Sequence, residues 1–180
     1  ALGLWLGDGA CRQAVITSHD DDQPIVRARI ESEGHVTTEQ STRMTFGILD
    51  IKVKLRDDLN VLGNKHIPTA YLLASVAQRR ALLHGLMDSD GNVSKDGQCM
   101  FSTSNKAIRD GFWELCHSLG IKASYSSFIP KIGDKEYKRS YRFSFYDDDA
   151  CHLPRKRERC RKHIKPVGRY ISFTPDGVAD

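Results

Sequence analysis

The sequence predicts an α+β protein of two similar halves, residues 1–80 and 81–180, that form one compact unit. A repeat supports this interpretation: the apolar run Ala1–Gly9 returns as Leu83–Gly91, with small residues four apart and a closing Asp-Gly. A Lys-His-Ile triplet at 65–67 also returns at 162–164, and each copy follows the aspartate of its own half at a similar interval. Repeats of this kind indicate a duplicated structural unit.

The second half shows the pattern of each element in turn. Residues 92–104 predict a hairpin around the turn-forming Lys95-Asp96-Gly97. Asn105 can cap a helix whose apolar residues fall on one face until Gly120 closes it. Alternating segments at 122–129 and 137–145 predict two strands, and the second has one apolar face, made by Tyr137, Tyr141, Phe143 and Phe145. A closing helix is expected at 147–161.

The first half repeats this order in shorter form. We expect a hairpin near 10–18 and a helix at 22–32 that ends before Gly34. Strands are expected at 35–39 and 42–49, followed by short helical pieces around 55–62. Each half is therefore expected to run helix, strands, helix, strands, helix.

Composition excludes some classes of protein. The apolar fraction of 39% favours a packed interior, and no apolar run approaches the length of a membrane span. A net charge of +4 permits nucleic-acid binding without requiring it, and the dense basic run 155–165 fits either a solvated helix face or phosphate contacts. Five cysteines without a paired framework are typical of reduced, intracellular thiols, and their spacing from His152 and His163 fits no common zinc finger. A start without Met inside an apolar run suggests an excised domain.

The two Asp-Gly helix ends predict a metal site. Small residues four apart let two helices pack closely, which would bring Asp8 and Asp90 together at one end. Each carboxylate then lies at a helix C-terminus, where the macrodipole disfavours negative charge, and the two repel each other. A divalent cation such as Mg²⁺ relieves both penalties. The alternative is that Asp-Gly simply closes a buried helix, but two matched copies favour the metal site.

The repeat resembles the motif of LAGLIDADG homing endonucleases. The second copy agrees at Leu83, Gly85, Leu86, Asp88, Asp90 and Gly91. The first agrees at Gly3, Leu4, Asp8 and Gly9, but Leu6 stands where the motif has its first acid. Further agreement at 65–68, 101–104, 109–111, 118–120 and 168–173 extends the resemblance over nearly the whole chain. It is strongest to the branch with the endonuclease domain of the yeast vacuolar-ATPase intein and the related mating-type switching endonuclease.

This resemblance implies a fold, an activity and a set of site residues. The fold would be two pseudo-symmetric αββαββα halves whose saddle-shaped antiparallel sheets grip double-stranded DNA. The activity would be Mg²⁺-dependent, site-specific double-strand cleavage by a monomer at a long asymmetric site, inside the cell and in the nucleus of a eukaryotic host. The implied metal site comprises Asp8, Asp90, Gly7 and Ser89. The implied catalytic lysines are Lys65 and Lys162, with Lys165 as the alternative to Lys162.

The polar strand faces are the expected DNA interface, because two-stranded ribbons fit the major groove. Each candidate could equally be plain solvated surface. The candidates are Arg43, Thr45, Lys122, Ser124, Ser126, Lys138, Arg142 and Ser144, with Lys165 for phosphates and, from the resemblance, Thr103 and Asn105. His19 and the acids at 20–22 are better explained as acids at a helix N-terminus than as a metal site.

Two other functions are compatible with the sequence. A maturase or transcription factor on the same fold would bind nucleic acid without cutting it, although such a binder has no need of both aspartates and both lysines. Self-splicing would require flanking parts, because the chain has no leading Cys or Ser and no terminal His-Asn.

Overall fold

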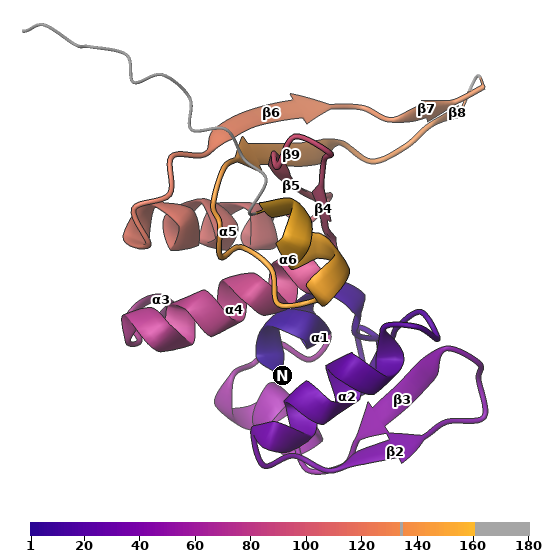
Figure 1. Ribbon diagram of the computed structural model, residues 1–180. Helices are drawn as coiled ribbons and strands as arrows, with labels where there is room; N and C mark the ends of the chain where they lie inside the picture. Colours follow the sequence, from indigo (N-terminus) through magenta and orange to yellow (C-terminus); the bar gives the residue numbers. More distant parts are fainter. Residues whose placement is uncertain (134, 161–180) are drawn as a thin grey trace, which may run out of the picture.

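The computed structural model describes residues 1–133 and 135–160 (Figure 1). The second half has the expected order, with a four-stranded antiparallel sheet in the order β4-β5-β9-β6. Its elements are α4 (Val76–Ser89), β4 (Gly91–Val93), β5 (Cys99–Thr103), α5 (Lys106–Ser118), β6 (Ser124–Phe128), β9 (Ser140–Phe145) and α6 (Pro154–Cys160). A two-stranded arm, β7 (Lys131–Ile132) with β8 (Lys135–Glu136), extends from the connection between β6 and β9.

Local signals explain where these helices begin and end. A capping box starts α4, because Ser75 and Gln78 satisfy each other's backbone N–H groups. The Asn105 side chain accepts hydrogen bonds from the first turn of α5, and Gly120 follows that helix with a φ of +71°. The apolar face of β9 packs on α5, where the ring of Phe112 lies 5.0 Å from that of Phe143.

The first half is a smaller version of the same plan. Its three-stranded antiparallel sheet has the order β1-β3-β2. The elements are α1 (Leu2–Asp8), β1 (Val15–Thr17), α2 (Gln23–Ser32), β2 (Thr37–Glu39), β3 (Thr45–Ile48), a π-helical turn η1 (Lys54–Asp58) and α3 (Thr69–Leu72). The α+β class and the mixed helix and antiparallel sheet architecture are thus confirmed.

Three elements differ from expectation. The strand expected at 137–145 begins only at Ser140, so Tyr137 lies before β9 and is 43% exposed. The hairpin expected near 10–18 is reduced to β1 and an isolated bridge between Gly9 and Ile16. The helix expected at 147–161 begins only at Pro154, since proline disfavours helical backbone in the residue before it. The carboxylate of Asp88 instead accepts hydrogen bonds from the backbone N–H groups of His152 and Leu153.

The motif helices α1 and α4 lie side by side at the centre of the molecule, with the two sheets on either side (Figure 1). Gly3 and Gly85 make this approach possible. A Cβ atom at Gly85 would lie 2.6 Å from the backbone nitrogen of Leu4, and one at Gly3 would lie 2.4 Å from the carbonyl oxygen of Leu82. None of the helices within the described residues is long and apolar enough to cross a membrane.

Candidate active site

The two motif aspartates meet at one end of the seam between α1 and α4. Asp8 is the last residue of α1, and Asp90 caps α4. Both side chains reach solvent. Even so, the atoms packed around Asp8, together with the charge of Asp90, raise the pKa of Asp8 to about 6. Burial also raises the pKa of Asp90. Keeping both carboxylates charged is therefore unfavourable in the metal-free protein. The pair offers the hard oxygen donors that a divalent cation binds, and the charge of such an ion would remove this penalty.

Lys65 binds the carbonyl groups at the C-terminal end of α1. Its Nζ atom donates to the carbonyl oxygens of Leu6, Gly7 and Gly9 at 3.0, 3.0 and 2.6 Å. It also lies 5.1 Å from the centroid of the Trp5 ring. Burial lowers the pKa of this lysine, while the nearby carboxylates, Asp90 first among them, oppose the shift. The predicted lysine of the first half is therefore at the carboxylate pair.

A different lysine, Lys156 on α6, binds the carbonyl groups at the C-terminal end of α4. Its Nζ atom donates to the carbonyl oxygens of Met87, Asp88, Ser89 and Gly91 at 2.8, 2.7, 3.5 and 2.7 Å. Residues 88, 89 and 91 occupy the same places in the repeat as residues 6, 7 and 9 beside Lys65. Lys156 is thus the pseudo-symmetric partner of Lys65, and its side chain is almost fully buried.

Sequence reasoning missed Lys156. Lys162 and Lys165, the predicted second lysines, lie outside the described residues, so their roles stay predictions. The spacing along the chain offered a signal. If the number of residues from Asp8 to Lys65 is counted onward from Asp90, the position reached is nearer to Lys156 than to Lys162. The repeated Lys-His-Ile triplet favoured the other alignment.

The other predicted metal-site residues flank the carboxylates. The carbonyl oxygen of Gly7 is already an acceptor for Lys65. The hydroxyl of Ser89 donates back to the carbonyl oxygens of Gly85 and Leu86 in its own helix. Both residues can offer a backbone carbonyl oxygen, and Ser89 also keeps the lone pairs of its hydroxyl oxygen. No group of three or more His, Cys, Asp or Glu side chains within the described residues is arranged to hold a metal ion, so the site would depend on the two carboxylates.

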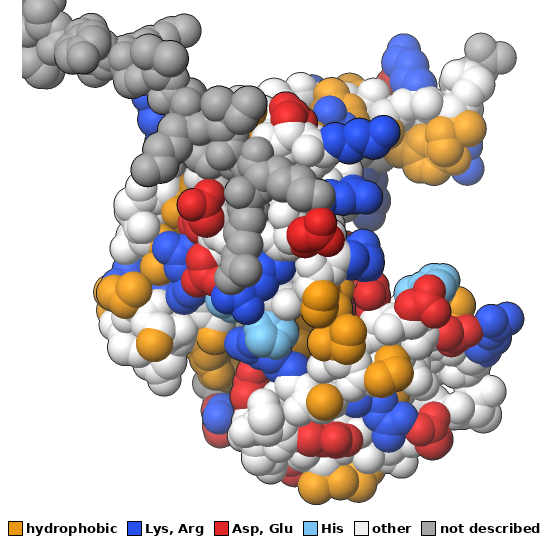
Figure 2. Space-filling model, in the orientation of Figure 1, with side chains coloured by type: hydrophobic (Ala, Val, Ile, Leu, Met, Phe, Trp, Pro, Cys, Tyr) orange, Lys and Arg blue, Asp and Glu red, His pale blue; other side chains and the backbone are white. Residues whose placement is uncertain are grey.

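The open face of the second sheet is polar, as expected for a DNA interface. Arg142 is exposed on β9 and lies between Ser102 of β5 and Ser126 of β6, while Ser144 is aligned with Ser124. The guanidinium of Arg142 stacks over the Phe128 ring at 4.8 Å. Figure 2 shows a concave notch between this half and the first half, with Lys and Arg side chains along the edge below the β7–β8 arm.

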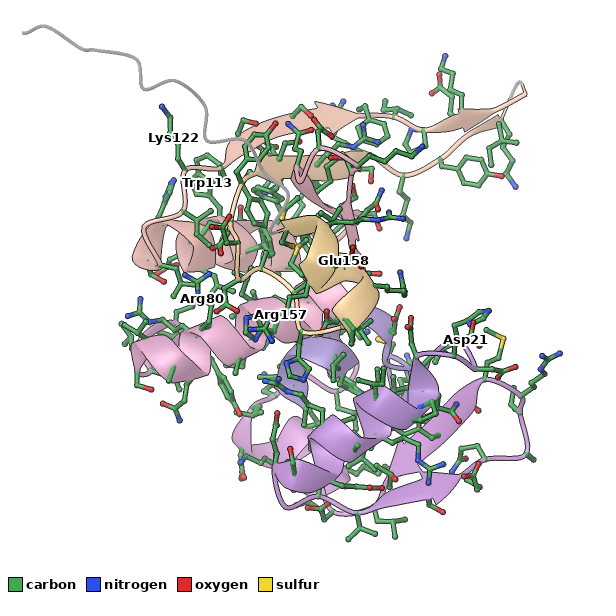
Figure 3. The ribbon with its side chains drawn as sticks, viewed as in Figure 1. Asp21, Arg80, Trp113, Lys122, Arg157 and Glu158 are labelled. Atoms are coloured by element: carbon green, nitrogen blue, oxygen red, sulfur yellow. The ribbon has the colours of Figure 1, made fainter. Side chains whose placement is uncertain are left out.

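Other DNA-binding candidates are placed less simply. Lys122 lies between α5 and β6, at the opposite side of the view from the loop that carries Asp21 (Figure 3). Arg43 is exposed but is paired with Asp20 at 2.7 Å. The side chains at Thr45, Thr103 and Asn105 have partners within the protein: the Thr42 carbonyl, the Asn105 N–H and the Lys65 carbonyl, respectively. Lys138 is exposed between β8 and β9.

The basic run begins with a mixture of buried and exposed side chains, since Lys156 is buried whereas Arg155 and Arg159 are exposed. Lys156 inserts into the end of α4, and Arg155 pairs with Asp22 of the first half at 2.5 Å. Arg157, labelled in Figure 3, lies 3.9 Å from Asp149. Lys156 therefore belongs to the site, residues 161–165 lie outside the described residues, and phosphate contacts by the run stay a prediction.

Comparisons with known proteins define the class of fold. Residues 66–153 match the family model described as Homing endonuclease. A structure of I-DmoI in complex with DNA and Ca superposes with a TM-score of 0.57, at 13% identity, over 90% of this chain and 95% of that one. Mesophilic variants of the homing endonuclease I-DmoI give a TM-score of 0.54 at 12% identity, over 92% and 93% of the two chains. The protein therefore has the fold of LAGLIDADG homing endonucleases.

Two curated relatives are similar in sequence. The replicative DNA helicase DnaB of Mycobacterium intracellulare is 41% identical over 126 residues. The homothallic switching endonuclease of Saccharomyces cerevisiae is 26% identical over 163 residues. Each match covers 70% of this chain but only 19% and 28% of the respective relative. Similarity to the switching endonuclease was expected from the sequence, whereas the likeness to the vacuolar-ATPase intein stays a prediction.

Proposed function

We propose that this chain is a LAGLIDADG homing endonuclease that cuts both strands of a long, asymmetric DNA site as a monomer. The observation that carries the proposal is the duplicated centre: two carboxylates at the end of the α1–α4 seam, each beside a lysine that closes a motif helix. One such centre per strand is what double-strand cleavage by one chain requires. A protein that only binds nucleic acid has no use for either charge pair.

Each residue of the centre has a physical role. The lysines hold positive charge beside the carboxylates, where charge develops on the phosphate during hydrolysis. The carboxylates would hold a divalent cation, and this ion would supply Lewis-acid activation of the phosphate and of the attacking water. We propose Mg²⁺ as this ion, because it is bound through one or two carboxylates together with substrate phosphates and water. Solved structures of I-DmoI include complexes with DNA and Ca, with DNA and Mn, and a variant with its target in the presence of Mg.

We further propose that the chain is the nuclease part of an intein. A relative named as a replicative helicase, of which the match covers 19%, is what a nuclease inserted within a larger host protein would produce. Splicing chemistry would then reside in flanking sequence. Expression of the longer gene product would test this: a ligated host protein beside the released insert supports insertion, and one uncleaved polypeptide argues against it.

Cleavage of a randomised plasmid library with Mg²⁺, followed by sequencing of the ends, tests the nuclease function and defines the site. Asp8→Asn and Asp90→Asn should abolish double-strand cutting, while binding measured in Ca²⁺ persists. A protein that binds the library without cutting it would be a maturase-like or regulatory binder. Sedimentation should give a monomer, and an obligate dimer would contradict the assignment of both centres to one chain.

A further inference from the structure

Two equivalent residues reach across the seam between the halves. Asp22 precedes α2 in the first half, and Asn105 precedes α5 in the second. They follow the motif aspartates Asp8 and Asp90 at nearly the same interval, so they occupy the same place in the repeat. Each side chain forms hydrogen bonds with the segment that carries a site lysine, and in each case this segment belongs to the other half.

Asp22 acts on the segment that carries Lys156. Its carboxylate accepts hydrogen bonds from Arg155 Nε at 3.0 Å and Arg155 Nη2 at 2.5 Å. Asp22 is only 9% exposed and makes no capping bond within its own helix, so the carboxylate is committed to Arg155. Because Arg155 directly precedes Lys156, this pair ties the backbone of that lysine to the first half.

Asn105 acts on Lys65 itself. Its Nδ2 atom donates to the backbone carbonyl oxygen of Lys65 at 2.8 Å, while its Oδ1 atom caps α5. The neighbouring residue Ile67 packs directly on α5, since a Cβ atom at Gly111 would lie 2.7 Å from the Ile67 Cβ. The segment that carries the lysine of the first half is thus held on the second half.

We propose that Asp22 and Asn105 are reciprocal positioning residues, each fixing the lysine whose motif helix belongs to the opposite half. Neither lysine is then placed by its own half alone. A displacement of about 1 Å in a catalytic group can cost on the order of 100-fold in rate, so such supports matter although they touch no substrate. The inference rests on the proposed nuclease function.

Strand-specific cleavage tests the reciprocity. The substrate is a duplex carrying the site selected from the random library, with a different label on each strand. Asp22→Ser should slow, on the order of tenfold or more, the strand that Lys156→Met slows. Asn105→Ser should slow the strand that Lys65→Met slows, because serine keeps the helix cap but lacks the reaching amide. Each variant should cut the remaining strand at the rate of the unmodified protein.

Matched substitutions at neighbouring positions provide the controls. Asp21→Ser removes the adjacent acid, which is labelled in Figure 3 and has a side chain that is 90% exposed, and Asn64→Ser makes the same change as Asn105→Ser but beside Lys65. Both should cut both strands at the unmodified rate. Equal slowing of the two strands by Asp22→Ser or Asn105→Ser, or no slowing at all, would overturn the proposal.

A second measurement needs no DNA. Limited acetylation with acetic anhydride, read by mass spectrometry, reports how accessible each lysine amine is. Asp22→Ser and Arg155→Gln should raise modification of Lys156 severalfold and leave Lys65 unchanged, and Asn105→Ser should do the reverse. Parallel changes at both lysines would refute reciprocal positioning. If the unmodified protein cuts no DNA, the nuclease function falls, while this assay still decides whether the two lysines are held crosswise.

Discussion

An alanine at Gly85 should force the two motif helices apart. The added Cβ would lie 2.6 Å from the Leu4 nitrogen and 2.8 Å from two backbone atoms of Gly3. All three obstacles are backbone, so no side chain can rotate away. Restoring an ordinary separation of 3.4 Å requires the helices to separate by about 0.8 Å at this point.

The energetic cost follows from two opposing effects. Overpacking of this kind costs about 1–3 kcal/mol, and the upper end applies here because the contact is between backbones. Alanine regains about 1 kcal/mol of helix propensity relative to glycine. The net loss of about 2 kcal/mol should lower the melting temperature by about 4–8 °C in a domain of this size. Displacement of the seam should also reduce the cleavage rate by up to about 100-fold.

Thermal melts and single-turnover cleavage of Gly85→Ala measure these effects, and Gly7 provides the control. A Cβ at Gly7 would meet side chains and no backbone: the Oγ and Cβ atoms of Ser89 at 1.9 and 2.6 Å, and Asp90 Oδ2 at an ordinary 3.4 Å. Gly7→Ala should therefore be rescued by Ser89→Gly, whereas Gly85→Ala should have no such remedy. Unchanged melting and cleavage of Gly85→Ala would refute the argument that backbone contact sets the geometry of the site.

Three further predictions concern charge. The pKa of Asp8 is raised from 3.8 to about 6, so this carboxyl stabilises the metal-free protein below pH 3.8 and the effect is lost as the pH rises through about 6. Thermal melts across this pH range should show the loss. Ca²⁺ should stabilise the protein mainly above this range. Asp22 has the opposite sign, because pairing with an arginine lowers its pKa: its contribution is present above the ordinary value of 3.8 and lost in acid, and Asp22→Asn should make the melting temperature less acid-sensitive. Lys156→Met should slow cleavage by orders of magnitude with little change in DNA affinity. Arg142→Ala should instead weaken DNA binding and lower its salt slope by about one unit. If Lys162→Ala gives the result expected for Lys156→Met, the sequence-based assignment of the second lysine stands.

The fold and the carboxylate pair could be predicted because they depend on local and repeated patterns. Apolar alternation marks β9, a cap and a positive-φ glycine mark α5, and small residues four apart mark the seam. Each of these signals lies close in the chain to the feature it specifies. The hairpin near 10–18 was expected to be longer than it is. A segment this short has too few residues for apolar–polar alternation to distinguish a single bridge from a longer strand pairing.

The lysine of the second half could not be assigned in this way. Lys156 stands within a run rich in basic residues, and the pattern of such a run is the same whether a given side chain faces solvent or the interior. Its role depends on where α6 begins, and this is decided by Pro154 and by the distant carboxylate of Asp88. Contacts between residues so far apart in the chain leave no local signal in one sequence.

The departure of the first motif copy from its pattern has a structural reason. In the second half, the first acid of the motif, Asp88, accepts hydrogen bonds from two backbone N–H groups just before α6 and so fixes the start of the helix that carries Lys156. Lys65 has no such helix, because it lies in the segment before α3 and is held through Asn105. An acid at position 6 would have no helix start to cap there, and Leu6, 3% exposed, contributes to the core instead. The two halves thus place equivalent lysines by different supports, and this asymmetry is why one motif copy needs its first acid and the other does not.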